Sequence, residues 1–191
     1  MRRDRECEVR KGARFARQMD CPAFRFRKVG HDQSIPYKKY IMNTTETTSE
    51  CIDRCNKLLR GERSAVETYA IAIEKFGDDP RVEKLKDICQ EHRHSVSDLE
   101  KNIQDMGGDP DTDSGAWGGL AQAVQKSANL LGTQGALESL ASGEKIGLKD
   151  YEKAIDSGKL MPECVELVRL QLIPRIESHL SILERLEERV D

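Results

Sequence analysis

Residues 50–76 read ECIDRCNKLLRGERSAVETYAIAIEKF, and this stretch decides the fold. Its apolar side chains return every three or four residues, which is the spacing of one face of a helix. They are Ile52, Cys55, Leu59, Val66, Tyr69, Ile73 and Phe76. The sequence Gly77-Asp78-Asp79-Pro80 then interrupts the pattern, and Pro80 suits the first turn of a following helix. The pattern therefore predicts an amphipathic helix over residues 50–76.

The same spacing predicts three more long helices, over residues 80–106, 134–157 and 162–189. A long connection, residues 107–133, separates the second helix from the third and includes a short helix over 117–131. Pro174 lies inside the last helix and should kink it. Two short connections and one long crossover predict an all-α, ferritin-like four-helix bundle over residues 48–191.

Composition and charge support this fold class. The chain has 191 residues, of which 34% are charged and 5% aromatic, a balance that favours amphipathic helices over a β-sandwich or barrel. The longest apolar run, Tyr69 to Ile73, is far too short to cross a bilayer, so we expect no membrane partner. Residues 42–191 hold 19 Lys and Arg against 29 Asp and Glu. This acidic bundle should repel nucleic acid.

Residues 1–47 are predicted to be a basic N-terminal extension. Residues 1–41 hold 12 Lys and Arg against 5 Asp and Glu, without a sustained helical period. This composition predicts disorder. Arginines interleaved with Phe15, Phe24 and Phe26 would suit an anionic partner. A further hypothesis is that the native protein starts at Met42, which would place these residues upstream of it.

The cysteines do not form the pattern of a disulfide framework. Four of the six lie within predicted helices, where free cysteine behaves as a small buried hydrophobe: Cys51, Cys55, Cys89 and Cys164. Cys51 and Cys55 are one turn apart, but no matching pair follows at zinc-site spacing, so a zinc ribbon is not expected. This cysteine usage favours a reducing, cytoplasmic location.

Each predicted long helix places one ionisable residue on its apolar stripe, close to its middle. These four residues are Glu62, His92, Glu144 and His179. In a bundle of nearly equal helices they should meet at one level. An unpaired carboxylate is too costly to bury there, whereas two Glu and two His suit one divalent ion of iron, zinc or manganese. In the alternative, Glu62–His179 and His92–Glu144 pairs satisfy all four groups without metal.

Polar residues next to these four receive lesser roles. Tyr69 and Tyr151 face inward and either donate hydrogen bonds to a carboxylate or simply fill the core. Glu67, Glu91 and His94 fall toward the flanks of their helices, so we expect them on solvated faces.

Three segments resemble ferritin-like proteins. Residues 58–69, LLRGERSAVETY, resemble the first-helix motif of bacterioferritin and rubrerythrin-like proteins, with Glu62 at a metal-ligand position. Residues 144–151, EKIGLKDY, resemble their third-helix motif, and His179 falls on their fourth-helix histidine. From Cys51 to Val190 the chain is most similar to an uncharacterised group of bacterial ferritin-like four-helix-bundle proteins. The resemblance implies a homodimer.

The di-iron motifs of those relatives are degenerate here. Di-iron members carry Glu-x-x-His on the second and fourth helices, and the two Glu residues bridge the metals. This chain has His92 and Ser95 on the second helix, and Ile176 at the fourth-helix Glu position, with Glu177 one place away. Both bridging carboxylates are therefore missing, which favours a single-metal site or a metal-free bundle.

Three classes of function follow. The first is a ferritin-like protein that binds one divalent metal in its core. The second is a stress or interaction bundle without metal, and the third, which ranks last, is a di-iron oxidoreductase or ferroxidase. Whether the chain is an enzyme stays open, although the missing bridging carboxylates favour a protein that is not.

Overall fold

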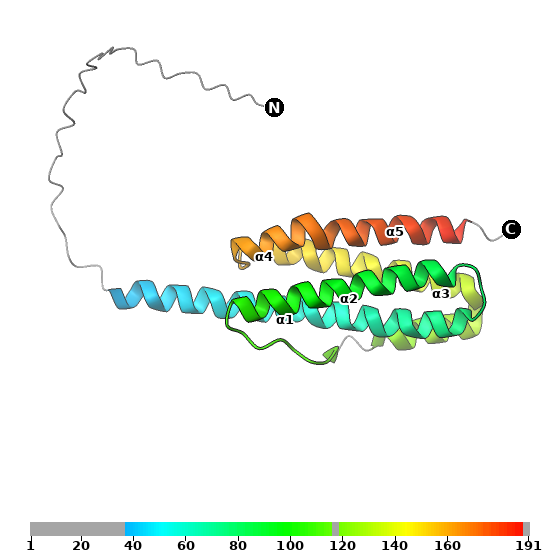
Figure 1. The fold of residues 1–191 in the computed structure, drawn as a ribbon, viewed down its shortest axis with the longest axis horizontal. Coiled ribbons are helices and arrows are strands. Elements are labelled where there is room, and N and C mark those ends of the chain that lie inside the picture. Colours follow the sequence, from blue (N-terminus) through cyan, green and yellow to red (C-terminus); the bar gives the residue numbers. More distant parts are fainter. Residues whose placement is uncertain (1–36, 116–118, 189–191) are drawn as a thin grey trace, which may run out of the picture. The chain divides into compact units, whose positions relative to one another are not determined.

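The computed structural model describes residues 37–115 and 119–188, which belong to one compact unit, Pro36–Asp191. Its elements are all helical (Figure 1): α1 (Tyr37–Phe76), α2 (Val82–Asp105), α3 (Gly119–Asp156), α4 (Pro162–Leu167), the π-helical turn η2 (Val168–Leu172) and α5 (Ile173–Glu187). The described residues contain no strand. The predicted all-α four-helix bundle is confirmed, with α4, η2 and α5 forming the fourth helix.

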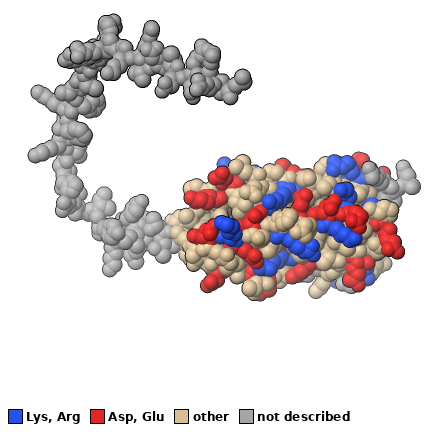
Figure 2. Space-filling model, viewed as in Figure 1, with Lys and Arg blue, Asp and Glu red and all other residues tan. Residues whose placement is uncertain are grey.

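The helices pack in the order that the predicted connections require. α1 lies against α2 and α3, and α3 lies against α5. The α1–α2 connection and the α3–α4 connection are short, whereas a long connection leads from α2 to α3. None of the described helices is long and apolar enough to cross a membrane. Positive and negative side chains are interspersed over the face of the bundle seen in Figure 2.

The start of α1 differs from the prediction. The helix begins at Tyr37 rather than near residue 50. Residues 37–50 contain neither proline nor glycine, so nothing stops the helix until Pro36 is reached. The predicted extension, residues 1–47, therefore overlaps α1 in residues 37–47, and Met42 lies inside the helix. Residues 1–36 lie outside the described residues, and their predicted disorder stays a prediction.

One face of α1 holds the described part of the long connection in place. The Asn56 side chain donates to the carbonyl of Asp109 at 3.0 Å and accepts from the Asp111 backbone at 2.8 Å. Arg60 forms an ion pair with Asp111. A Cβ atom at Gly108 would lie 2.8 Å from the Ile52 side chain, which would have to move to make room for it. Residues 116–118 of this connection lie outside the described residues.

α3 consists of two helical segments. Gly132 has φ 67° and ψ −155°, which interrupts the helical backbone. This positive φ is accessible to glycine but costly for residues with a Cβ. The break lies between the predicted helices 117–131 and 134–157, so the prediction of two helices in this region is confirmed.

Pro174 affects the fourth helix through the turn that precedes it. Proline cannot donate a backbone hydrogen bond, and its ring clashes with the carbonyl one turn back. The chain accommodates it with η2, where the Ile173 N–H bonds to the Val168 carbonyl, five residues earlier. Buried residues recur here every four positions, at Cys164, Val168, Leu172 and Ile176. This spacing exceeds the α-helical period of about 3.6 residues, and the wider π turn keeps them on one inward face.

The core contains two apolar clusters with a polar layer between them. One includes Cys51, Leu59, Leu99 and Ile103, among others, and the second includes Tyr69, Phe76, Leu85, Leu137 and Leu183. On every helix the mid-helix polar residue falls between the members of the two clusters: Glu62, His92, Glu144 and His179. The predicted inward stripes are thus observed, and the polar layer divides the core.

We expect Asp79→Ala to lower the free energy of unfolding by about 0.5–1.5 kcal/mol, because it removes the side-chain hydrogen bonds that hold the turn ahead of α2. Asp79 Oδ1 accepts from the backbone N–H of Arg81 at 2.9 Å, ahead of α2. The Arg81 guanidinium also bonds to Asp79 and to Thr133 at 2.9 Å, which ties this turn to α3. Urea unfolding of the variant at neutral pH measures the change.

The hydrogen bond from the Arg81 side chain lowers the pKa of Asp79 below its ordinary value. The stabilisation is therefore present above the pKa of the unfolded chain and is lost as the pH falls through the lowered pKa. The difference between wild type and Asp79→Ala should shrink in acid. Asp87→Ala, which removes an exposed pair with Lys84, is the control and should change stability little. Equal effects of the two substitutions would contradict the prediction.

Candidate metal centre

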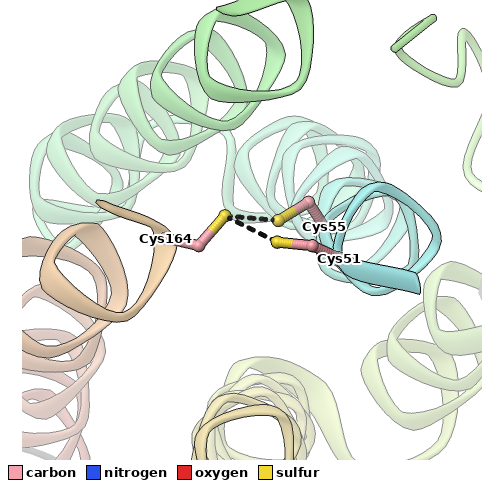
Figure 3. A group of neighbouring side chains, drawn as sticks. All are labelled: Cys51, Cys55 and Cys164. Carbon is pink, nitrogen blue, oxygen red and sulfur yellow. Dashed lines mark hydrogen bonds between the residues drawn. The ribbon is translucent and has the colours of Figure 1, made fainter. Parts of the chain in front are cut away.

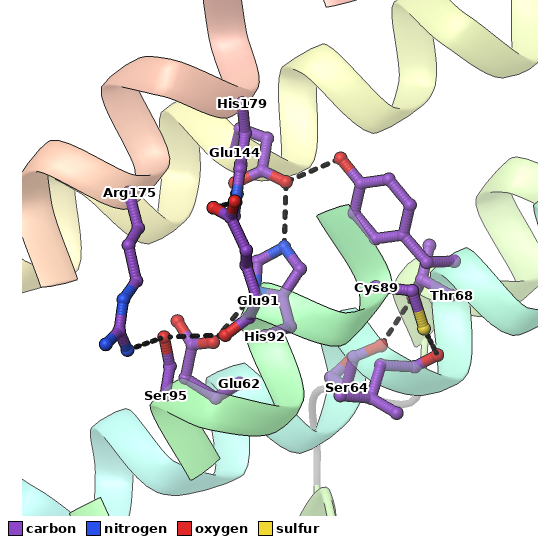
Figure 4. A network of polar contacts seen from close by, with 12 residues as sticks. Glu62, Ser64, Thr68, Cys89, Glu91, His92, Ser95, Glu144, Arg175 and His179 are labelled. Carbon is purple, nitrogen blue, oxygen red and sulfur yellow. Dashed lines mark hydrogen bonds and ion pairs between the residues drawn. The ribbon is translucent and has the colours of Figure 1, made fainter. Parts of the chain in front are cut away.

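The four predicted site residues meet in the polar layer of the bundle. Glu62 comes from α1, His92 from α2, Glu144 from α3 and His179 from α5, and Figure 4 shows these side chains pointing toward one another. At most 5% of any of the four is exposed to solvent. The amphipathic pattern that buries each helix thus brings two carboxylates and two imidazoles to one place.

His92 lies between the two carboxylates. Its Nδ1 is 2.8 Å from Glu62 Oε2, and its Nε2 is 2.9 Å from Glu144 Oε1. Burial lowers the pKa of His92, but Glu144 and Glu62 outweigh that effect and raise the pKa well above its usual value. A neutral imidazole carries one N–H, so a proton or another cation must lie on the second nitrogen to satisfy both contacts.

Two tyrosine hydroxyls complete the hydrogen bonding of the carboxylates. Tyr69 donates to Glu144 Oε1 at 2.6 Å, and Tyr151 donates to Glu62 Oε1 at 2.5 Å. Burial and the adjacent carboxylates raise the pKa of both phenols well above the ordinary value, so they remain protonated donors. Burial raises the pKa of Glu144, but His92 and His179 outweigh this and lower it. The hydrogen-bonding role of both tyrosines is confirmed.

His179 forms a hydrogen bond at one of its two ring nitrogens. Its Nε2 lies 2.9 Å from Glu91 Oε2, whereas its Nδ1 has no hydrogen-bond partner among the described residues. That Nδ1 is fully buried and lies 3.5 Å from Glu144 Oε2. The ring centres of His92 and His179 are 4.7 Å apart. The two imidazoles therefore approach Glu144 together.

One predicted detail of this region is wrong. The Glu62–His179 pair of the metal-free alternative does not form, because Glu62 pairs with His92 instead. Glu91 is 43% exposed, in keeping with its predicted place on the flank of its helix, but its carboxylate also contacts His179. Glu67 is exposed, as predicted, and accepts a hydrogen bond from the Ser114 hydroxyl at 2.9 Å. The pairing depends on how the helices are rotated against each other, which the periodicity of a single helix does not define.

Three of the four residues form a group that can hold a metal ion. His92, Glu144 and His179 each offer one ligand atom, and these atoms lie within 4.8 Å of one another. Glu62 is not part of this group and contacts the far nitrogen of His92. Imidazole nitrogen and carboxylate oxygen are ligands that zinc, iron and manganese accept in proteins.

A cavity of about 350 Å³ between α1 and α3 reaches this layer. Its walls include the small residues Gly61, Ala65, Gly143 and Gly147, and Glu62, His92 and Glu144 are among its lining. A Cβ atom at Gly61 would meet nothing within 4 Å, so there is open space beside α1. An ion or a small molecule therefore has a route to the polar layer.

Ser95 and Ile176 carry no carboxylate, and the structure shows what surrounds each of them. Ser95 accepts a hydrogen bond from Arg175 at 3.1 Å, as Figure 4 shows. The same guanidinium bonds to Asp98 at 2.8 Å. Ile176 is buried in an apolar cluster. Ser95 thus lies beside a guanidinium, and Ile176 lies among apolar side chains.

A second group of potential ligands escaped the sequence analysis. Cys51, Cys55 and Cys164 lie together (Figure 3), with ligand atoms within 4.8 Å of one another. Each is buried, as predicted. Burial raises the pKa of Cys51, and the contact with Cys55 together with burial raises that of Cys164. In the sequence, only the four-residue spacing of Cys51 and Cys55 indicated a possible ligand pair. Cys164 follows Cys55 by more than a hundred residues, so no local pattern connects it with them.

The fold and the site define an all-α four-helix bundle with a charged, hydrogen-bonded layer in its core. A family described as a domain of unknown function (DUF2383) matches residues 50–157, more than half of the chain. The chain belongs to this family. No curated protein and no solved structure matches it significantly. The matched region contains Glu62, His92 and Glu144, whereas His179 and Cys164 lie beyond it.

We expect Tyr151→Phe to destabilise the protein by about 1–3 kcal/mol, because it leaves a buried carboxylate oxygen of Glu62 without its hydroxyl donor. Tyr69→Phe is the matched comparison and should cost less, about 0.5–1.5 kcal/mol. Glu144 Oε1 keeps His92 as a partner when the Tyr69 hydroxyl is removed. Urea unfolding in the presence of a chelator measures both. A larger loss in Tyr69→Phe would contradict the assigned roles.

Proposed function

We propose that the bundle binds one divalent transition-metal ion in its core through His92, Glu144 and His179. The observation that carries the proposal is the convergence of three ligand atoms, from α2, α3 and α5, within 4.8 Å. A second observation is the buried Nδ1 of His179, which faces Glu144 and has no hydrogen-bond partner among the described residues. A buried nitrogen that faces a carboxylate in this way needs a proton or a metal ion between the two, and a metal ion would also engage His92.

The contact at the second ring nitrogen of each histidine supports the same proposal. His92 Nδ1 contacts Glu62, and His179 Nε2 contacts Glu91. In metal sites, a histidine ligand donates its other N–H to a carboxylate or carbonyl, which fixes the tautomer and the ring orientation. We therefore assign Glu62 and Glu91 to orienting the two imidazoles, although Glu62 was predicted as a ligand. The nitrogens that remain, His92 Nε2 and His179 Nδ1, both face Glu144.

The donor set suits iron, zinc or manganese in the divalent state. Three protein ligands leave a coordination position for water or another small ligand, and such a metal would act as a Lewis acid or bind that ligand. The cavity between α1 and α3 supplies the route. Tyr69 holds Glu144 by its hydroxyl, and the surrounding apolar clusters limit access of water from the two ends of the bundle.

A metal-free interaction bundle is the second candidate function. The observation in its favour is that His92, with a proton on each nitrogen, satisfies Glu62 and Glu144 without any metal. A di-iron oxidoreductase ranks last, because Ser95 and Ile176 stand where it requires carboxylates. The resemblance to bacterioferritin and rubrerythrin-like proteins, a homodimer and a cytoplasmic location remain part of this proposal, and they rest on the sequence.

Metal content tests the proposal. The full chain is stripped with a chelator, dialysed against Mn²⁺, Zn²⁺ or anaerobic Fe²⁺, and analysed for metal per chain. We expect His179→Ala and Glu144→Gln each to bind one equivalent less than wild type. His94→Ala is the matched control, because His94 is an exposed histidine of α2 and should leave the stoichiometry unchanged.

Circular dichroism of each variant shows whether the bundle is still folded. A folded His179→Ala that binds as much metal as wild type would overturn the proposal. If the wild-type protein binds none of the three ions, the metal proposal is wrong and the metal-free interaction bundle is the candidate function that remains. Rapid oxidation of added Fe²⁺ at two ions per chain would instead favour the di-iron oxidoreductase.

A further inference from the structure

Three cysteine thiols face one another inside the first apolar cluster. Cys55 Sγ lies 2.8 Å from Cys164 Sγ, and Cys51 Sγ lies 3.5 Å from Cys164 Sγ. In Figure 3 the three side chains point into one space between α1 and α4. None of the three exposes more than 1% of its surface. The thiols therefore form a compact sulfur cluster, separate from the imidazoles and carboxylates of the polar layer.

The fold builds this cluster from two distant segments. Cys51 and Cys55 are one turn apart on the inward face of α1, and Cys164 lies on α4, the start of the fourth helix. The backbone N–H of Met161 donates to Cys51 Sγ at 3.2 Å. From α2, Asn102 Oδ1 lies 2.6 Å from Cys164 Sγ and 4.0 Å from Cys55 Sγ. Three helices thus direct sulfur and oxygen atoms to one point.

We propose that Cys51, Cys55 and Cys164 form a second metal site, for one thiophilic ion such as Zn²⁺ or Cu⁺. Thiolate sulfur selects these ions over Mn²⁺. The three ligand atoms lie within 4.8 Å of one another. With zinc–sulfur bonds of about 2.3 Å, sulfurs bound to one zinc ion are about 3.8 Å apart, so small side-chain rotations are sufficient. The Asn102 side-chain carbonyl oxygen beside the cluster is a further potential metal ligand.

The contacts of the cluster suit metal-bound thiolates. Each Sγ–metal bond forms as the S–H proton leaves for solvent, so the ion releases up to three protons. The three cysteines belong to the same apolar cluster as Leu59, Leu99 and Leu160, and apolar surroundings would not hold thiolate charge without a cation. The Met161 N–H stabilises a negative sulfur at Cys51.

A Cys55–Cys164 disulfide is the competing outcome. It would satisfy the short contact between these two sulfurs, and it would leave Cys51 as a free thiol. A disulfide would use only two of the three sulfurs. A single metal ion accounts for the convergence of all three Sγ atoms, with the Asn102 oxygen beside them.

The test is a Cd²⁺ titration of the full chain, reduced and stripped of metal, in which the ultraviolet absorption of cadmium–thiolate bonds is recorded. Every protein carries His179→Ala, so that the proposed imidazole site contributes nothing. In the parent protein, which carries only His179→Ala, we expect one equivalent of Cd²⁺ to produce the absorption. The Cys55→Ala and Cys164→Ala variants of this parent should not show it. Cys89→Ala is the matched control, because Cys89 is buried outside the cluster. It should give the same absorption as the parent.

Protein loaded beforehand with Zn²⁺ or with buffered Cu⁺ then identifies the preferred ion, which should raise the concentration of Cd²⁺ needed to produce the cadmium–thiolate absorption. Circular dichroism confirms that each variant is folded. Absence of the absorption from folded parent protein would overturn the proposal. So would an unchanged absorption in folded Cys164→Ala, or a Cys55–Cys164 disulfide found by peptide mass mapping of protein purified without reductant.

Discussion

The contact of His92 with two buried carboxylates is the interaction on which the rest of the bundle depends. Glu62 and Glu144 lie in the middle of the core, where an unpaired charge would cost several kcal/mol. The imidazole reaches both carboxylates, and two tyrosine hydroxyls donate to them. Every helix must therefore present its mid-helix polar residue at one level. Sliding or rotating one helix would leave a buried charge without its partner.

This requirement explains how the apolar core is arranged. The two clusters lie on either side of the polar layer, so hydrophobic burial holds the four helices together at both ends. Glycines of α1 and α3 leave a cavity beside the layer. On the fourth helix, the π turn before Pro174 keeps Cys164 and His179 on the same inward face, although about four turns of helix separate them. The sulfur cluster and the imidazole site both depend on that turn.

Local sequence patterns predict some features of this structure and miss others. The spacing of Ile52, Cys55 and Leu59 was enough to predict α1, because a helix that buries one face must repeat about every 3.6 residues. The same pattern identified Glu62 and His92 as inward residues. It failed at the start of α1, where no apolar stripe marks the helix. It also did not predict that the exposed Glu91 contacts His179.

By itself, the sequence determined the four-helix bundle, the long connection after α2 and the four ionisable residues of the polar layer, because helical periodicity is a local property. Only the tertiary structure decided the pairing within that layer. It placed Glu62 behind His92 rather than beside His179, and it brought Cys164 to Cys51 and Cys55. Such contacts depend on the rotation and level of one helix against another, and packing sets these across the whole bundle.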